Sequence, residues 1–227
     1  MPRVSRRHVW RVFTGGAIIS CRILVFAKAP VPGRVKTRLV SALGEAGAAQ
    51  LHRHLVERTL DTSSAAGVGA IELCCAPDTD DPYFVACAKR YRLSLGAQGE
   101  GDLGARMRRA LERALAAGTP ALLIGCDCPA LTPAYLREAA DALGGGSDAV
   151  FGPAEDGGYV LVGLARMPSA PLFEDIAWGT ATVMPETRVR LQHLGWRWQE
   201  LATLWDVDRP EDLLRLRQQH GDWVRAV

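Results

Sequence analysis

The segment Ala121–Thr132, ALLIGCDCPALT, is an apolar run that ends at Asp127 and is followed two residues later by Pro129. An apolar run of this length, closed by a turn signal, is typical of a buried parallel strand. Open α/β sheets bind ligands in the crevice beyond the carboxyl ends of their strands. We therefore interpret Asp127 as a site residue.

A basic loop follows the first apolar run of the chain. The segment Ala27–Leu39, AKAPVPGRVKTRL, begins at Ala27 and Lys28 and turns at its prolines and at Gly33. It then presents three cations within five residues, Arg34, Lys36 and Arg38. Such side chains bind polyphosphate oxygens, so the pattern predicts a phosphate-binding loop, although it matches neither the P-loop nor the GxGxxG signature. The alternative is a basic surface turn that leads into a helix.

Two glycine-rich segments follow further along the chain. In the first, QGEGDLGARM, Gly101 permits close backbone approach, Asp102 is expected to cap a helix, and Arg106 is expected to face the crevice. In the second, GPAEDGGYVLVG, a turn precedes a strand and serves either as a hairpin-like connection or as an acceptor-binding lip. The candidate acceptor residues there are Asp156, Gly157, Gly158 and Tyr159, together with Trp178, whose alternative role is to close a core edge.

Two further aspartates stand near the end of the chain, in LWDVDRPEDL. Asp206 and Asp208 precede a helix with Pro210 near its first turn, so helix capping is one interpretation of Asp208. A role beside Asp127 is the other interpretation.

The six cysteines form no CxxC pair, which argues against a disulfide framework or a zinc ribbon. Cys74, Cys75 and Cys126 fall in apolar runs and are expected to be buried, while Cys128 is expected to be more exposed. His52 and His54 lie two residues apart on a predicted helix, so they cannot share a face as metal ligands, and a surface or partly buried position is expected.

Strand and helix signals alternate over the whole chain and predict a single α/β domain, with a mostly parallel sheet covered by helices on both faces. The predicted strands cover 22–29, 70–76, 93–97, 121–125, 148–152, 158–163 and 197–201. The predicted helices cover 45–64, 81–91, 103–117, 132–143, 183–194 and 210–219. We expect a basic N-terminal arm over 1–21 and one domain over 22–227.

Together, KTRL, GCDCPALT, DGGY and DVDRPEDL resemble the nucleotide-diphospho-sugar transferase superfamily, over roughly residues 22–219. Within it, the chain is most similar to a bacterial glycosyltransferase-like group related to the molybdenum-cofactor and phospholactate guanylyltransferases. The resemblance implies a GT-A, Rossmann-like fold and a transferase. It also implies a divalent cation, Mg²⁺ or Mn²⁺, held by Asp127 and Asp208, with Asp206 as a substitute.

The resemblance further implies that Arg34, Lys36 and Asp127 are catalytic, because phosphoryl transfer depends on positioning and charge neutralisation. Glycosyltransferases of this fold commonly carry two aspartates one residue apart, whereas Pro129 stands at the second position here. This favours nucleotidyl transfer from a nucleoside triphosphate to a small (phosphorylated) acceptor. Glycosyl transfer from an NDP-sugar is the first alternative, and a non-catalytic nucleotide-binding protein is the second.

The formal net charge of +2 is too small to indicate a nucleic-acid surface. No apolar run reaches the length of a membrane span, so we expect a cytoplasmic protein. The expected partners are a nucleotide or nucleotide-sugar and a small-molecule acceptor, and the sequence leaves the oligomeric state open.

Overall fold

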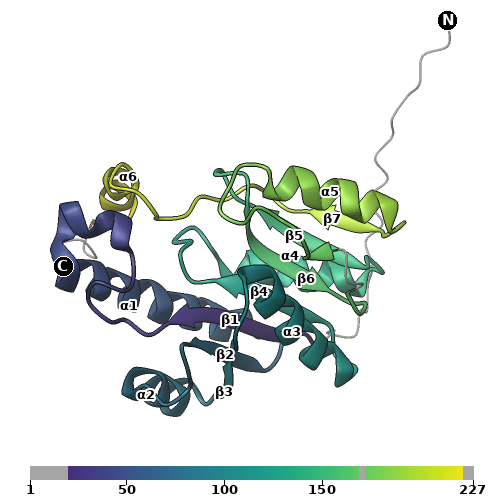
Figure 1. The fold of residues 1–227 in the computed structure, drawn as a ribbon. Coiled ribbons are helices and arrows are strands. Elements are labelled where there is room, and N and C mark those ends of the chain that lie inside the picture. Colours follow the sequence, from purple (N-terminus) through teal and green to yellow (C-terminus); the bar gives the residue numbers. More distant parts are fainter. Residues whose placement is uncertain (1–19, 169–171, 222–227) are drawn as a thin grey trace, which may run out of the picture.

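The computed structural model describes residues 20–168 and 172–221, and its strands form one sheet (Figure 1). The strands are β1 Arg22–Lys28, β2 Ile71–Ala76, β3 Ser94–Ala97, β4 Ala121–Gly125, β5 Ala149–Pro153, β6 Tyr159–Leu164 and β7 Trp198–Glu200. The α-helices are α1 Val40–Ala66, α2 Pro82–Tyr91, α3 Leu103–Ala116, α4 Pro133–Gly144, α5 Val183–His193 and α6 Asp212–Gln219. The predicted basic arm lies outside the described residues, apart from Ser20 and Cys21.

The sheet has the strand order β3-β2-β1-β4-β6-β5-β7. Strand β6 runs antiparallel to both of its neighbours, β4 and β5, and all the other strand pairs are parallel. The carboxyl ends of β1, β2, β3 and β4 therefore meet at one edge, and this edge is where a doubly wound sheet binds ligands.

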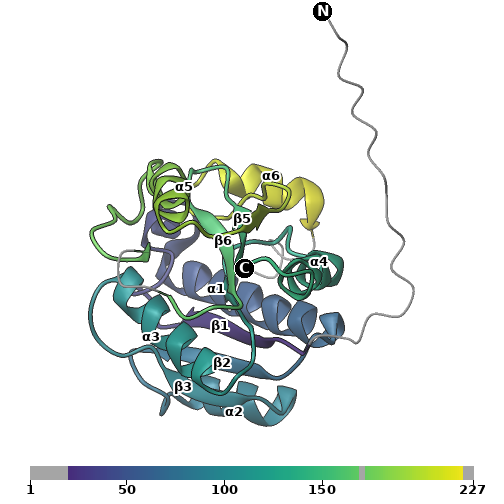
Figure 2. The ribbon, with the colours of Figure 1, turned by 90° about the vertical axis from the view of Figure 1, so that its right-hand side faces the viewer.

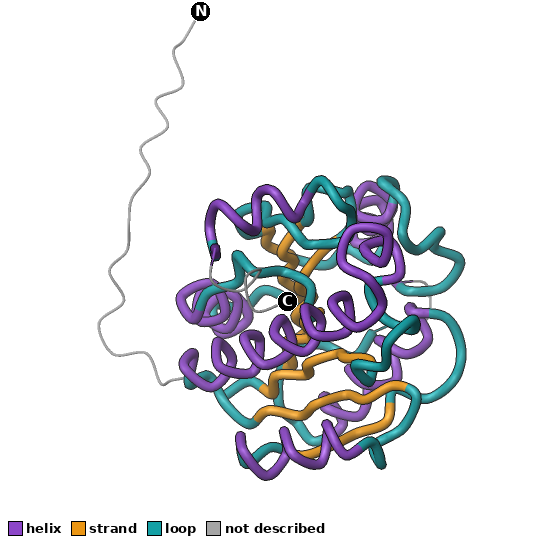
Figure 3. The backbone as a smooth tube through the Cα atoms, turned by 90° about the vertical axis from the view of Figure 1, so that its left-hand side faces the viewer, coloured by secondary structure: helices purple, strands orange, loops and turns teal. Residues whose placement is uncertain are grey.

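Helices cover both faces of the sheet, as predicted. Figure 2 shows α3 and α5 on one side and α4 on the other, and Figure 3 shows the strands as the central layer between helices. Alternate residues of β1 divide between the two cores: Ile23 and Val25 pack with α1, α2 and α4, while Leu24 packs with α3 and α5. This two-sided burial explains the continuous apolar runs in the sequence.

Local signals fix several helix ends. Thr132 caps α4 by accepting a hydrogen bond from the Tyr135 backbone N–H, and Asp102 caps α3 by accepting one from Ala105. The long helix begins earlier than predicted, at Val40, because a first turn over residues 40–43, which follows the 3₁₀ turn Thr37–Leu39, is joined to the rest of the helix across a kink at Gly44, where φ is 70°. The positive φ at this kink is a conformation that glycine adopts without strain.

In a small third core, the C-terminal segment packs against the N-terminal half of α1 and the turn before it. Trp205, Val207 and Leu213 pack there against Leu39 and Leu51. This packing brings the segment with Asp206 and Asp208 to the carboxyl edge of the sheet. Within the described residues, no helix is long and apolar enough to span a membrane.

Candidate active site

Asp127 follows strand β4 directly, as predicted, and is tied to two distant segments. Its backbone carbonyl accepts a hydrogen bond from the Val207 N–H at 2.9 Å. Its carboxylate Oδ1 accepts one from Lys36 Nζ, also at 2.9 Å, and the same ammonium donates to the Val207 carbonyl. One lysine therefore joins the basic loop, the tip of β4 and the C-terminal segment.

The Lys36–Asp127 pair is asymmetric in its exposure: the lysine side chain is 4% exposed and the aspartate side chain 48%. Burial by itself lowers the pKa of Lys36, but the charge of Asp127 and their hydrogen bond outweigh it, so the pKa is raised. Burial raises the pKa of Asp127, and the Lys36 ammonium more than compensates, so that pKa is lowered. Both groups are therefore charged at neutral pH, and the aspartate keeps an accessible face.

A cavity of about 500 Å³ opens beside this pair at the ends of β1 and β4. We call it the cationic pocket, because its lining includes five cations, Lys28, Arg34, Lys36, Arg38 and Arg106. Among the described residues, two carboxylates line it, those of Asp127 and Asp208. An excess of three positive charges in one concave site suits a polyphosphate.

Arg106 is held over the cationic pocket by Gln98, a buried residue at the end of β3 that sequence reasoning missed. The Gln98 amide donates to the carbonyls of Ala27 and Cys74, which fixes its orientation. Its Oε1 then accepts from Arg106 Nη1 at 3.1 Å. The only signal in the sequence was a polar residue directly after a short strand.

A second cavity, of about 330 Å³, lies on the other side of Asp127. We call it the acceptor pocket, because residues predicted from the sequence to bind an acceptor line it. It is lined by four of the predicted acceptor residues, Asp156, Gly158, Tyr159 and Trp178, and by Asp206. Leu103, Gly125 and Asp127 line both cavities, so the two meet at the tip of β4.

Asp206 and Asp208 have different surroundings. Asp208 lines the cationic pocket and its carboxylate accepts a hydrogen bond from Arg38. Burial raises the pKa of Asp206 to about 6, and the charges of Asp156 and Asp127 add to the rise. The capping interpretation of Asp208 is wrong, because Asp212 caps this turn by accepting hydrogen bonds from the Asp208 and Arg209 backbones.

The carboxylates fit a hard divalent cation. Asp127 and Asp206 line one cavity and repel each other, and a cation between them would relieve that repulsion. Asp208 fits less directly, because Arg38 already neutralises it. The substitute ligand proposed from sequence, Asp206, is thus placed better than Asp208.

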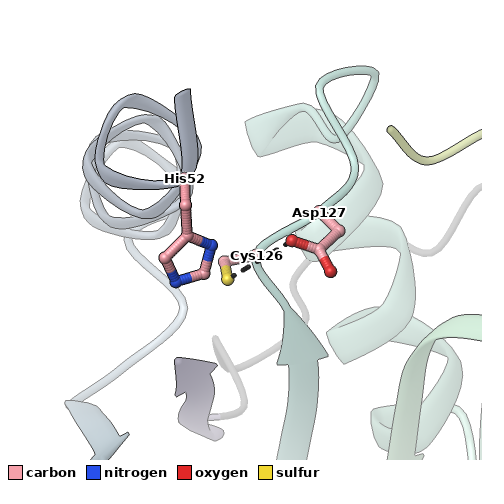
Figure 4. A group of neighbouring side chains, drawn as sticks. All are labelled: His52, Cys126 and Asp127. Carbon is pink, nitrogen blue, oxygen red and sulfur yellow. Dashed lines mark hydrogen bonds between the residues drawn. The ribbon is translucent and has the colours of Figure 1, made fainter. Parts of the chain in front are cut away.

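His52 lies beside Asp127, contrary to the expected surface or partly buried position. It is 5% exposed, its Nε2 lies 3.0 Å from the Lys28 carbonyl, and its Nδ1 is buried without a hydrogen-bond partner. Figure 4 shows this nitrogen facing the thiol of Cys126, which donates to Asp127. The three side chains form a group that could hold a metal ion, with ligand atoms within 4.8 Å of one another. His52 was missed because its burial depends on how α1 packs.

The remaining predicted site residues lie outside both cavities. Gly33, Gly101 and Asp102 do not line the cationic pocket, and Asp102 serves as a helix cap. Gly157 does not line the acceptor pocket; its φ is 89°, and an added Cβ would lie 2.4 Å from the Ala181 carbonyl oxygen. These glycines and Asp102 shape the loops instead. Cys128 is 5% exposed, so the expectation of greater exposure is wrong.

The fold and the similarity to solved structures place the chain in the nucleotide-diphospho-sugar transferase superfamily, with the GT-A architecture, as predicted. Within it, the chain belongs to the bacterial family described as "Uncharacterized protein conserved in bacteria (DUF2064)", which matches residues 59–180. No curated protein matches the chain.

Solved structures similar to this chain support the assignment. A Desulfovibrio desulfuricans G20 protein assigned as a nucleotide-diphospho-sugar transferase is 29% identical over 92% of this chain and 98% of its own, with a TM-score of 0.78. The 4-diphosphocytidyl-2C-methyl-D-erythritol synthase of Anaerococcus prevotii DSM 20548 is 12% identical, with a TM-score of 0.61, over 90% of this chain and all of its own. A nucleotidyl transferase of Methanothermobacter is 18% identical, with a TM-score of 0.57, over 91% of this chain and 99% of its own. The last two share the fold alone.

Proposed function

We propose that this protein transfers a nucleotidyl group from a nucleoside triphosphate to a small acceptor. The observation that carries the proposal is the position of Asp127 between a cationic pocket and a second cavity. A donor bound through its phosphates in the first cavity and an acceptor in the second would meet at this residue.

The charge of the cationic pocket favours a triphosphate donor. Its five cations and two carboxylates leave an excess of three positive charges. Among the described residues, Lys28, Arg34 and Arg106 have no carboxylate partner within ion-pair distance, whereas Lys36 and Arg38 contact Asp127 and Asp208. These charges neutralise the phosphates and the leaving group as it departs.

The reaction follows from this arrangement. The acceptor oxygen forms a bond to the α-phosphorus, the bond between that phosphorus and its β-bridging oxygen breaks, and pyrophosphate leaves in line. The acceptor proton passes to water. Asp127 and Asp206 would hold a divalent cation, Mg²⁺ or Mn²⁺, which when bound supplies further neutralisation of the phosphate charge.

Glycosyl transfer from an NDP-sugar is the second candidate. It is favoured by the similarity to the Desulfovibrio protein over nearly the whole of both chains. In that case the bond broken is the one between the anomeric carbon and the diphosphate oxygen, and a nucleoside diphosphate leaves.

The test compares panels of nucleoside triphosphates and NDP-sugars, each with and without Mg²⁺ or Mn²⁺. We expect a triphosphate to raise the melting temperature and to be converted with release of pyrophosphate. Release of a nucleoside diphosphate from an NDP-sugar would establish the second candidate instead. Binding without turnover in any combination, acceptor pools included, would indicate a non-catalytic nucleotide-binding protein. Asp127→Asn is the inactive control.

A further inference from the structure

The two cavities differ sharply in charge. Five lysine and arginine side chains line the cationic pocket, whereas none of the described residues around the acceptor pocket is a lysine, arginine or histidine. Three carboxylates line the acceptor pocket, those of Asp127, Asp156 and Asp206. The Lys36 ammonium already offsets the charge of Asp127, so Asp156 and Asp206 carry the unbalanced negative charge of this pocket. The acceptor pocket therefore lacks the groups that bind a phosphate ester or a carboxylate.

The rest of the acceptor pocket is apolar and aromatic. Trp178 meets Tyr159 edge to face, with ring centroids 6.2 Å apart, and Leu103 and Met107 of α3 line the same cavity. Trp178 Nε1 and the Tyr159 hydroxyl are buried and have no hydrogen-bond partner among the described residues. Aromatic and aliphatic walls suit a molecule with an apolar face.

We infer that the acceptor is a hydroxyl-bearing molecule that carries an apolar face and no anionic group. This rests on the proposed function and replaces the expectation of a phosphorylated acceptor. The hydroxyl oxygen forms the new bond to the transferred group, the donor loses pyrophosphate, or a nucleoside diphosphate in glycosyl transfer, and the hydroxyl proton passes to water. The carboxylates of the pocket repel phosphate esters, so the same charge that accommodates a neutral acceptor rejects anionic ones.

The charge of the pocket can be measured without knowing the acceptor. Thr180 is exposed and lines the acceptor pocket, and all six native cysteines are buried, so Thr180→Cys introduces one accessible thiol. Its labelling rates are measured with cationic and anionic methanethiosulfonates of matched size. We expect the cationic reagent to react about tenfold faster, and the ratio to fall as salt is added. Thr37 is exposed and lines the cationic pocket, so Thr37→Cys serves as the control. Its thiol should react faster with the anionic reagent.

Two further substitutions, a test and its matched control, show whether the ratio of labelling rates depends on the carboxylates of the acceptor pocket. In the Thr180→Cys background, Asp156→Asn should lower the ratio, because it removes a carboxylate of the pocket and keeps an oxygen to accept the Gly158 N–H. Glu155→Gln should leave the ratio unchanged, since Glu155 pairs with Arg215 and does not line the cavity. Equal labelling by both reagents, or faster labelling by the anionic one, overturns the inference.

Turnover provides the second readout. The enzyme and its donor are incubated with two acceptor pools, neutral sugars and alkyl or aryl glycosides in one and the corresponding sugar phosphates in the other, and products are identified by mass. Products from the neutral pool support the inference, and products from the phosphate pool alone overturn it. If no donor is consumed, the proposed function fails, and the labelling ratio still decides the charge of the pocket.

Discussion

Replacing Asp206 by asparagine should make the protein more stable at neutral pH while impairing its activity. Asp206 is partly buried, and its pKa is raised from the ordinary 3.8 to about 6 by burial and by the charges of Asp156 and Asp127. The folded state therefore holds its proton more tightly than the unfolded state does. Asparagine has nearly the same shape and carries no charge, so the substitution removes the repulsion and leaves the packing in place.

The change in wild-type stability with pH follows from proton linkage. Between pH 4 and 6 the folded protein binds more protons at Asp206 than the unfolded chain, so wild-type stability falls as pH rises through this window and the loss is complete above it. A shift of about two pKa units corresponds to about 3 kcal/mol. Because Asp206 borders an open cavity, solvent reduces this to about 1–2 kcal/mol, or roughly 2–8 °C in melting temperature for a domain of this size.

The assay is urea unfolding of both proteins at half-unit steps from pH 4 to pH 8. The difference in free energy of unfolding should grow between pH 4 and 6 in favour of Asp206→Asn and stay constant above pH 7. Mn²⁺ at pH 7.5 should stabilise the wild type more than the variant, because only the wild type keeps both carboxylates. A pH-independent difference, or a less stable variant at pH 7.5, would refute the electrostatic reasoning. Asp208→Asn, which removes the partner of Arg38, serves as the control and should not stabilise.

Four further substitutions test other parts of the structure. Asp127→Asn should lower kcat/KM by about a hundredfold or more in steady-state assays, with unchanged circular dichroism, because its side chain is half exposed. Lys36→Met should weaken nucleotide binding in calorimetry and cost about 1–2 kcal/mol in urea unfolding, since it removes an ammonium that ties three segments together. Thr132→Ala should cost about 1 kcal/mol by the same measurement, and Thr132→Ser should restore most of it. Gly104→Ala should displace both the Phe173 backbone and Trp178, because the new Cβ would lie 2.3 Å from the Phe173 carbonyl oxygen and 2.8 Å from the Trp178 ring; tryptophan fluorescence should change and KM should rise for the acceptor, with nucleotide affinity retained.

The sequence predicts the elements of this fold well and their spatial order poorly. Each predicted strand and helix is present, with ends shifted by a few residues, because apolar periodicity and caps such as Thr132 are local signals. The turn at residues 156–158 indicated the antiparallel pairing of β5 and β6, but no local signal places β6 next to β4. The position of β6 depends on which strand edges the rest of the sheet leaves unpaired, and this is a property of the whole chain.

The candidate site divides in the same way. The cations and carboxylates were found because each follows a strand, and the carboxyl ends of parallel strands meet at one edge. His52 was missed because it lies in the middle of α1, where a histidine ordinarily faces solvent. Asp208 was open to interpretation as a cap, and only the structure shows that Asp212 takes that role.

Two carboxylates of the site are balanced before any ligand binds. Lys36 sits in a left-handed conformation, with φ of 48°, which carries its ammonium between Asp127 and the Val207 carbonyl. Arg38 from the same loop reaches Asp208, so one short loop neutralises two of the carboxylates that would otherwise repel each other. Asp206 has no such partner in the described structure, and its raised pKa records the unbalanced charge. Asp206 and Asp156, the carboxylates of the described site without a balancing cation, thus lie on the acceptor side of Asp127, where an incoming anion would meet repulsion and a divalent cation or a neutral hydroxyl would not.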